Sequence, residues 1–187
     1  SIATDLLSRL APPLDPTPAQ AEGPYYPPIK PTDTDNDLYE LTGASGAPAG
    51  TELTIEGLLV DTAAIPIAGA IIELWQTDAE GLYLHPDFDG EPLDQNFQYF
   101  GTSVTDEDGL WRFRTVEPLN YENRPKHLHI KVLDGEIALL TTQIYFSGDP
   151  LLDSDRVIGD VDLELLTATT EPRGSGLYAT HVLVIDG

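Results

Sequence analysis

From residue 51 onward the chain consists of short apolar or alternating runs separated by turn residues, and this pattern constrains the fold more than any other feature. Residues 110–116 alternate between apolar and polar side chains, and residues 70–75 form a nearly continuous apolar run. Alternation with a period of two is typical of a strand with one buried face. Further runs of this kind span residues 51–60, 101–105, 127–133, 138–146 and 177–185. The pattern predicts an all-β domain.

Turn residues between these runs indicate how the strands follow one another. The segments Asp106–Gly109 and Asp134–Glu136 both contain Asp-Gly, which favours β-hairpins. We therefore expect an antiparallel β-sandwich, and a closed barrel fits the same pattern. Short peripheral helices are expected at residues 1–10, ahead of a Pro-Pro pair, and within residues 151–166.

Residues 11–50 are rich in proline, glycine, threonine and aspartate. This composition is too rich in proline for a helix or a central strand, so an extended arm is expected. We accordingly divide the chain into an N-terminal helix and arm, residues 1–50, and a β-sandwich catalytic domain, residues 51–187. Two adjacent tyrosines, Tyr25 and Tyr26, could cover a pocket or a neighbouring subunit, or simply pack on the surface.

The charge and the missing residue types exclude several classes of function. Thirty-two acidic residues against nine basic ones give a net charge of −23, which repels nucleic acid and anionic membranes, so neither is expected as a partner. No apolar run reaches membrane-spanning length, and the first residues do not form a secretory signal, so we expect a cytoplasmic protein. Cysteine and methionine are absent, and a bound metal would therefore have nitrogen and oxygen ligands, which favours zinc, iron, manganese or magnesium.

His127 and His129 stand two residues apart in a run that is typical of a strand. Successive side chains of a strand point to opposite faces, so both imidazoles lie on one face, while Leu128 and Ile130 lie on the other. Their Cα atoms would be roughly 7 Å apart, which allows both rings to bind one metal ion. A histidine pair on a solvated strand face is the ordinary alternative.

Two tyrosines accompany the histidines as potential ligands. Tyr83 follows the apolar run that ends at Trp75, and Tyr121 shortly precedes His127. A phenol has a pKa near 10 and is a poor ligand for most divalent ions at neutral pH. Ligation by tyrosinate therefore indicates a hard trivalent ion, which among common ions means Fe(III). Taken alone, each tyrosine is equally typical of a core or turn position.

Several segments together resemble a known family. They occur in the family's order and cover roughly residues 55–155: Glu73–Tyr83, Pro92–Phe97, Thr105–Gly109, Phe113–Thr115, Arg124–His129 and Thr142–Pro150. The chain resembles the intradiol ring-cleavage dioxygenases, the group that contains protocatechuate 3,4-dioxygenase and catechol 1,2-dioxygenase. Agreement is weaker at Gly23-Pro24-Tyr25.

The resemblance implies a mononuclear non-haem Fe(III) and a reaction. Its four protein ligands would be Tyr83, Tyr121, His127 and His129. The substrate would be a catechol that chelates the iron and releases Tyr121, and O2 would cleave its ring to a cis,cis-muconate-type diacid.

The resemblance also implies roles for three residues around the metal. Arg124 matches the arginine that stabilises negative charge on the reacting ring, and a fixed cation in a water-poor pocket is a large catalytic term. Gln143 would orient this arginine or the substrate, and Tyr145 would hydrogen-bond around the metal site. Arg124 could otherwise be a surface ion-pair partner, and Gln143 and Tyr145 could simply pack in a strand.

Two departures from the family concern the substrate. Only residues Glu122–Lys126 separate Tyr121 from His127, a shorter stretch without the tryptophan found in protocatechuate-cleaving members. The segment before Tyr121 also lacks the usual glycine. These changes leave the proposed ligands in place and leave the identity of the catechol open.

Two other functions remain as alternatives. One is a non-enzymatic β-sandwich binding module, although an abandoned site has no reason to keep two phenols. The other is a zinc-dependent hydrolase that uses His127 and His129 together with Glu122 or another carboxylate. Because the proline-rich arm suits a subunit contact and family members commonly assemble, we expect a homo-oligomer.

Overall fold

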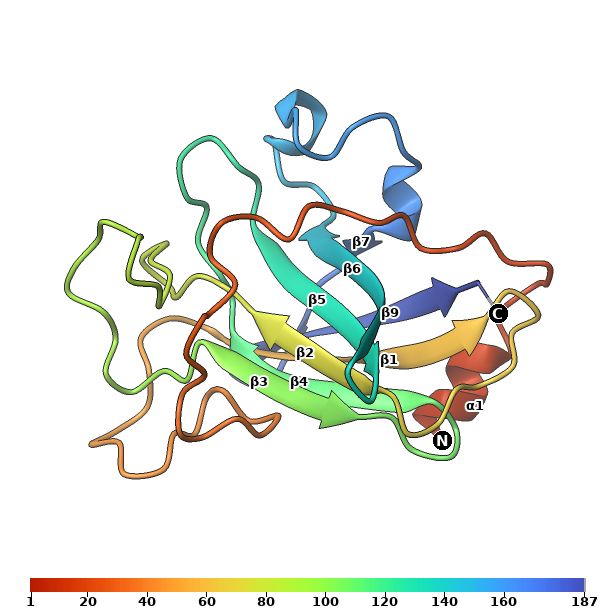
Figure 1. The fold of residues 1–187 in the computed structure, drawn as a ribbon, viewed down its shortest axis with the longest axis horizontal. Helices are drawn as coiled ribbons and strands as arrows, with labels where there is room; N and C mark the ends of the chain where they lie inside the picture. Colours follow the sequence, from red (N-terminus) through yellow and green to blue (C-terminus); the bar gives the residue numbers. More distant parts are fainter. Residues whose placement is uncertain (187) are drawn as a thin grey trace.

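The computed structural model describes residues 1–186 and places their strands in two sheets that pack face to face (Figure 1). One sheet has the order β4 (Leu110–Val116), β1 (Glu52–Asp61), β9 (Gly176–Ile185), β8 (Glu171–Arg173). The other has the order β3 (Phe100–Val104), β2 (Ile71–Trp75), β5 (His127–Asp134), β6 (Ile137–Phe146), β7 (Thr167–Ala168). The predicted β-sandwich is confirmed, and the sheets are open and separate instead of forming one closed barrel.

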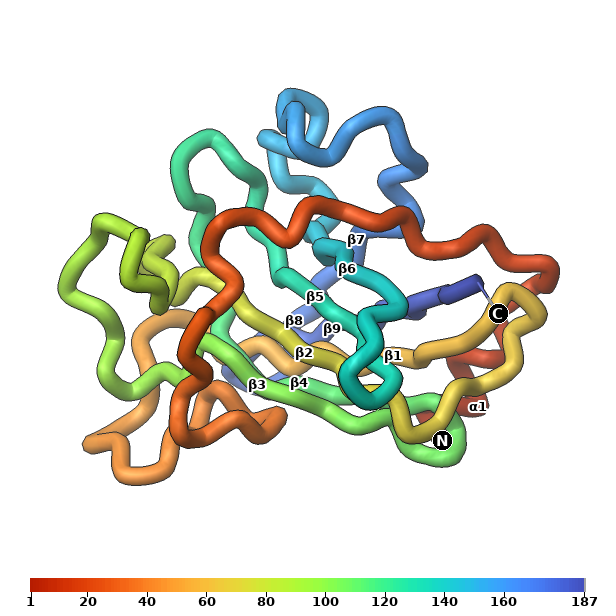
Figure 2. Tube along the Cα trace, viewed as in Figure 1, coloured from red at the N-terminus to blue at the C-terminus, as the bar shows by residue number. Residues whose placement is uncertain are grey.

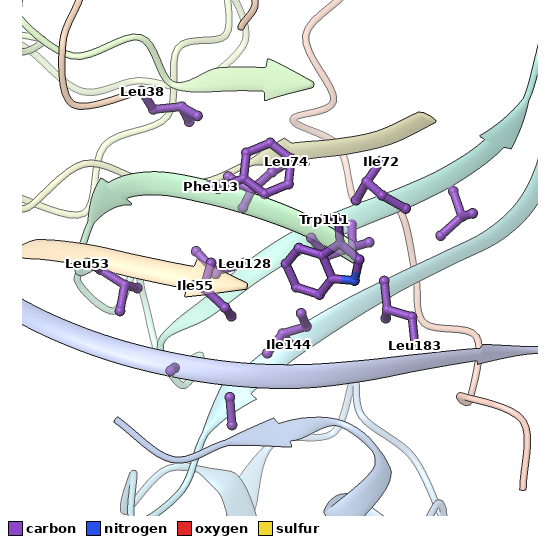
Figure 3. Packing of buried hydrophobic residues seen from close by; sticks show 14 of the residues in the cluster. Leu38, Leu53, Ile55, Ile72, Leu74, Trp111, Phe113, Leu128, Ile144 and Leu183 are labelled. Atoms are coloured by element: carbon purple, nitrogen blue, oxygen red, sulfur yellow. The ribbon is translucent and has the colours of Figure 1, made fainter. Parts of the chain in front are cut away.

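The main core lies between the two sheets, where the inward side chains of both meet (Figure 3). In β4 the alternation seen in the sequence buries Trp111 and Phe113 while Arg112 faces solvent. The facing sheet contributes Ile72 from β2 and Leu128 from β5. Fully burying an aliphatic or aromatic side chain stabilises a fold by roughly 1.5–3 kcal/mol, so this interior fixes the positions of β2 and β5.

Two predicted details of strand pairing are wrong. The turn Asp106–Gly109 does not close a hairpin, because β3 pairs with β2 in one sheet and β4 pairs with β1 in the other. The sheets are also not antiparallel throughout, since β1 pairs with β9, and β6 with β7, in parallel. Each parallel strand returns after a long excursion, which parallel pairing requires. The hairpin between β5 and β6 around Asp134–Glu136 is confirmed.

The helices are short, as predicted. Helix α1 (Ile2–Leu7) lies at the start of the chain and packs Ala3 and Leu6 against the outer side of the first sheet. The segment 151–166 contains two single-turn 3₁₀ helices, η1 (Leu152–Ser154) and η2 (Leu163–Leu165), in place of one continuous helix. Within residues 1–186, none of the helices has the length and apolar character needed to cross a bilayer.

The N-terminal arm is extended, as expected, and crosses from β9 over the outer face of the second sheet (Figure 2). Its backbone bonds β9 through Thr17 and β6 through Gln20. Farther along, the Tyr26 hydroxyl donates to Glu73 of β2. The arm therefore covers the face of the sheet that carries the histidine pair. The division of the chain at residue 50 stays a prediction.

Candidate metal centre

The two histidines of β5 lie on the same face of the sheet, as their spacing predicts. His129 pairs with Trp75 of β2 on one side and with Gln143 of β6 on the other, and His127 pairs with Tyr145. Both imidazoles are buried, with only 4% of each residue exposed. The pair is therefore not the solvated surface pair that its spacing alone allows.

Tyr83 completes a convergent group of three donor atoms. Its hydroxyl lies 3.1 Å from Nε2 of His127 and 2.9 Å from Nε2 of His129. The residue is buried and belongs to the loop that follows β2. One phenol oxygen and two imidazole nitrogens thus meet at one point, with their potential metal-binding atoms directed at each other.

The loop that carries Tyr83 is held against the loop that precedes β5. The hydroxyl of Thr77 donates to the Leu119 carbonyl at 2.8 Å. Gly81 has a φ of 81°, and a Cβ at this position would lie only 2.7 Å from the Asn120 carbonyl oxygen. A glycine therefore permits both the left-handed backbone and the close approach of the two loops.

Different contacts fix the two imidazoles. His127 Nδ1 lies 2.7 Å from the Pro125 carbonyl oxygen, and because a carbonyl can only accept, Nδ1 carries the proton and Nε2 the lone pair. His129 Nδ1 is buried and has no hydrogen-bond partner within the part of the chain that the structure describes. Its ring instead stacks on Trp75, with centroids 4.8 Å apart and 9° between the planes.

Tyr121 lies at the rim of the same group. Its ring centroid is 5.2 Å from that of Tyr83 and 6.1 Å from that of His127. The Arg124 backbone N–H donates to the Tyr121 carbonyl oxygen at 3.1 Å, and Tyr121 is half-buried. The structure therefore brings Tyr121 close to the other three residues but leaves it more exposed than Tyr83.

Burial sets the protonation states of these groups. It lowers the pKa of His127 to about 4 and the pKa of His129 well below its usual value, with the nearby Arg124 acting in the same direction. Burial raises the pKa of Tyr83 well above its ordinary range. The imidazoles are thus neutral at pH 7 and free to bind a metal, whereas the phenol ionises only when a strong Lewis acid binds it.

Arg124 stands beside this group at the centre of a hydrogen-bond network. Its Nη2 donates to Gln143 Oε1 at 2.9 Å and to the Tyr145 hydroxyl at 3.1 Å. Its Nε donates to Asp155 Oδ2 at 2.6 Å. Gln20 of the arm also reaches this network, accepting from Tyr145 at 3.2 Å. Arg124 is thus a half-buried member of the site and not a surface ion-pair partner.

The arm places one tyrosine in the site and one outside it. The Tyr25 ring lies 5.0 Å from Tyr83 and 5.9 Å from Tyr121. The Tyr26 ring contacts the ammonium groups of Lys30 and Lys131 instead, at 3.5 and 3.7 Å from its centroid. The arm therefore covers the site of its own chain.

Sequence reasoning missed three residues of this site. Asp155 follows β6 in an irregular segment, Gln20 lies in the arm, and Trp75 was recognised only as the end of a strand. For Trp75 a signal existed, because it is the last residue of the strand that precedes the Tyr83 loop. Nothing in the local sequence marks Asp155 or Gln20 as neighbours of Arg124.

The donor set fits Fe(III) better than zinc. No group of three or more histidine, cysteine, aspartate or glutamate side chains converges anywhere in residues 1–186. Glu122, the carboxylate considered for a zinc site, is exposed. A metal bound by His127 and His129 would therefore take Tyr83 as its third ligand, and tyrosinate favours a hard trivalent ion. The fold and this site define a β-sandwich protein with a buried histidine–tyrosine centre.

Comparison with known proteins agrees with this class. Residues 21–183 match the sequence model of a family described as dioxygenase. The chain is 36% identical over 132 residues to the protocatechuate 3,4-dioxygenase beta chain of Burkholderia cepacia, an alignment that covers 66% of this chain and 56% of the relative. It is 30% identical over 176 residues to catechol 1,2-dioxygenase 1 of Acinetobacter lwoffii, and this alignment covers 84% of this chain and 55% of the relative. The chain belongs to the intradiol ring-cleavage dioxygenase family.

Solved structures show the same fold. The dioxygenase domain of a dioxygenase–carbohydrate-binding fusion from Streptomyces sp. SirexAA-E superposes with a TM-score of 0.72 at 32% identity, covering 92% of this chain and 99% of that domain. The 3-chlorocatechol 1,2-dioxygenase of Rhodococcus opacus 1CP superposes with a TM-score of 0.70 at 23% identity, covering 90% of this chain and 72% of that chain. The chain spans about half the length of the curated relatives that it matches.

Proposed function

We propose that this protein is a non-haem Fe(III) intradiol dioxygenase that uses O2 to cleave catechols to cis,cis-muconate-type diacids. The observation that carries the proposal is the position of the Tyr83 hydroxyl, within 3.1 Å of Nε2 of both His127 and His129. Membership of the dioxygenase family supports the same activity. Neither a binding module nor a zinc hydrolase accounts for a buried phenol that faces two neutral imidazoles.

In this proposal, Tyr83, Tyr121, His127 and His129 hold the iron. Fe(III) would supply a Lewis acid that favours the ionised form of a bound catechol and makes its ring reactive toward O2. Tyr121 lies at the rim and is only half-buried, so it is the ligand best placed to leave. Its phenolate oxygen would then take a proton from a catechol hydroxyl.

Arg124 would supply a fixed positive charge beside the reacting ring. Its contacts with Gln143 and Tyr145 hold the guanidinium in place, and its charge opposes the rise in the pKa of Tyr121 that burial causes. A charge that is oriented before the reaction costs no reorganisation when negative charge develops on the ring. Gln143 acts here as the acceptor that orients Arg124.

The charges around the site favour a neutral catechol over one with a carboxylate substituent. Lys126 is paired with Glu117, and Lys131 with Glu22, so neither cation is free to receive an anion. A cleft of about 840 Å³ runs along Tyr83 and Phe88. Its other lining residues include one lysine, Lys30, against three exposed carboxylates: Asp87, Asp89 and Glu91. Catechol and its alkyl or halo derivatives, and hydroxyquinol, are therefore preferred to protocatechuate.

Oxygen uptake and product mass test the activity. Iron-loaded protein, mixed with catechol, should consume one O2 per catechol and give a product heavier than catechol by both oxygen atoms, which labelling with ¹⁸O2 would verify. Tyr83→Phe should abolish the reaction, because it removes one proposed ligand and keeps the ring. A protein that takes up iron and binds catechol but consumes no O2 would contradict the proposal and favour a binding module. A homo-oligomeric state and a cytoplasmic location stay predictions.

A further inference from the structure

Asp155 lies in the irregular segment after η1, and its carboxylate is buried against Arg124. Arg124 Nε donates to Asp155 Oδ2 at 2.6 Å, and the two side chains are only 12% and 1% exposed. A buried charge without a partner is strongly unfavourable, so each member of this pair holds the other in place. The pair is thus unlike the exposed ion pairs of this acidic surface.

Two separate contacts hold the guanidinium of Arg124. Asp155 accepts from Nε, while Gln143 and Tyr145 both accept from Nη2. Because the guanidinium is planar and rigid, contacts to two of its nitrogens fix both its plane and its rotation. The Arg124 backbone N–H also donates to the Tyr121 carbonyl oxygen at 3.1 Å, which keeps the arginine beside this proposed ligand.

The two oxygens of Asp155 have different partners. Oδ2 accepts from Arg124, and Oδ1 accepts from the backbone N–H of Val157 at 2.6 Å. The turn therefore fixes the carboxylate, and the carboxylate fixes the arginine. We propose that Asp155 is a positioning residue that holds Arg124 toward the reacting ring, an inference that rests on the proposed dioxygenase function.

The substitution Asp155→Asn separates this role from a purely structural one. The amide can keep its oxygen on the Val157 N–H, which preserves the turn, but then its NH₂ group faces Arg124 Nε–H, donor against donor. The variant thus breaks the ion pair with little change in shape. Asp153→Asn is the matched control, because Asp153 lies two residues earlier in the same segment and is exposed.

Steady-state kinetics with catechol give the first readout. Asp155→Asn should lower kcat by about 10- to 100-fold, as expected for loss of a group that orients a functional side chain, with a smaller change in KM. In the Arg124→Ala background the same substitution should change kcat less than about twofold, because Asp155 acts only through Arg124. Equal losses in both backgrounds, or no loss beyond that of Asp153→Asn, would overturn the proposal.

Chemical labelling gives a second readout that needs neither iron nor turnover. Phenylglyoxal modifies accessible arginines, and peptide mass spectrometry can follow Arg124 and the exposed Arg112 in one sample. Asp155→Asn should increase modification of Arg124 relative to Arg112 severalfold, and Asp153→Asn should leave the ratio unchanged. An unchanged ratio in Asp155→Asn would show that Asp155 does not hold Arg124. If wild-type protein consumed no catechol, the proposed function would fail while this labelling would still decide the role of Asp155.

Discussion

The indole of Trp75 lies parallel to the imidazole of His129, with their centroids 4.8 Å apart. The two residues are register partners on neighbouring strands, so the pairing of β2 with β5 creates the stack. Within residues 1–186, His129 Nδ1 has no partner for the hydrogen bond that usually orients a metal-binding histidine. Stacking on Trp75 therefore replaces that bond as the contact that fixes the ring.

Replacement of Trp75 should thus weaken metal binding as well as folding. We expect Trp75→Ala to lower the free energy of unfolding by roughly 3–5 kcal/mol, because it leaves a cavity in a buried site. Iron affinity should fall by about 10- to 100-fold, as for other groups that orient a ligand. Trp75→Phe keeps a stacking face, so it should lose less of the free energy of unfolding and less of the iron affinity. Competition with a chelator measures the affinity, and an affinity unchanged in Trp75→Ala would refute this role.

Arg124→Ala should lower turnover of catechol by on the order of 10²-fold or more, by analogy with the loss of other groups that stabilise developing charge. Catechol should still bind the iron and change the visible spectrum, because Arg124 is not a proposed ligand. Arg112→Ala on the exposed face of β4 is the control. Stopped-flow absorbance separates binding from turnover. Near-normal turnover in Arg124→Ala would return this residue to a structural role.

The rates with different catechols should depend on substituent charge and on salt. Neutral catechols should give a higher kcat/KM than protocatechuate, because three exposed carboxylates and one lysine, Lys30, line the cleft, while Lys126 and Lys131 are paired with carboxylates. Added salt should narrow the gap, since it screens exposed charges. Steady-state rates for the panel at low and high ionic strength measure this. A strict preference for protocatechuate at both ionic strengths would indicate a cationic wall elsewhere in the pocket.

The stability of the metal-free protein should fall in mild acid. Burial lowers the pKa of His181, which is outside the metal centre, to about 4, from an ordinary value of 6.5. Between pH 6.5 and 4 the unfolded chain therefore binds more protons than the folded chain. The free energy of unfolding keeps the whole contribution of neutral His181 above pH 6.5, and it loses up to about 3 kcal/mol as the pH falls toward 4. Urea unfolding of wild type and His181→Gln over this range should show a shallower pH dependence in the variant. Equal slopes would contradict this assignment.

Local patterns in the sequence predicted the parts of the molecule that depend on strand periodicity. The shared face of His127 and His129 follows directly from a period of two, as do the buried Trp111 and Phe113 of β4. Strand periodicity could not place Tyr83 and Tyr121, because both lie in loops, where no period relates a residue to its neighbours. Their proximity to the histidines depends on how the two loops pack.

Long-range pairing could not be predicted from local patterns. Asp-Gly within Asp106–Gly109 does form a tight turn, but turn chemistry does not determine whether the flanking strands join one sheet or two. Asp155 is 31 residues from Arg124, and an irregular segment brings them together. Such contacts depend on the packing of the whole sandwich and leave no local signature.

The metal content and the visible spectrum of the purified protein test whether the histidine–tyrosine group is an iron centre. We expect about one Fe(III) per chain and a red-brown colour from tyrosinate-to-iron charge transfer. Tyr83→Phe should weaken this absorption, and His127→Ala or His129→Ala should abolish it while the sandwich stays largely folded. A colourless protein that contains stoichiometric zinc and never takes up iron would contradict the proposed centre.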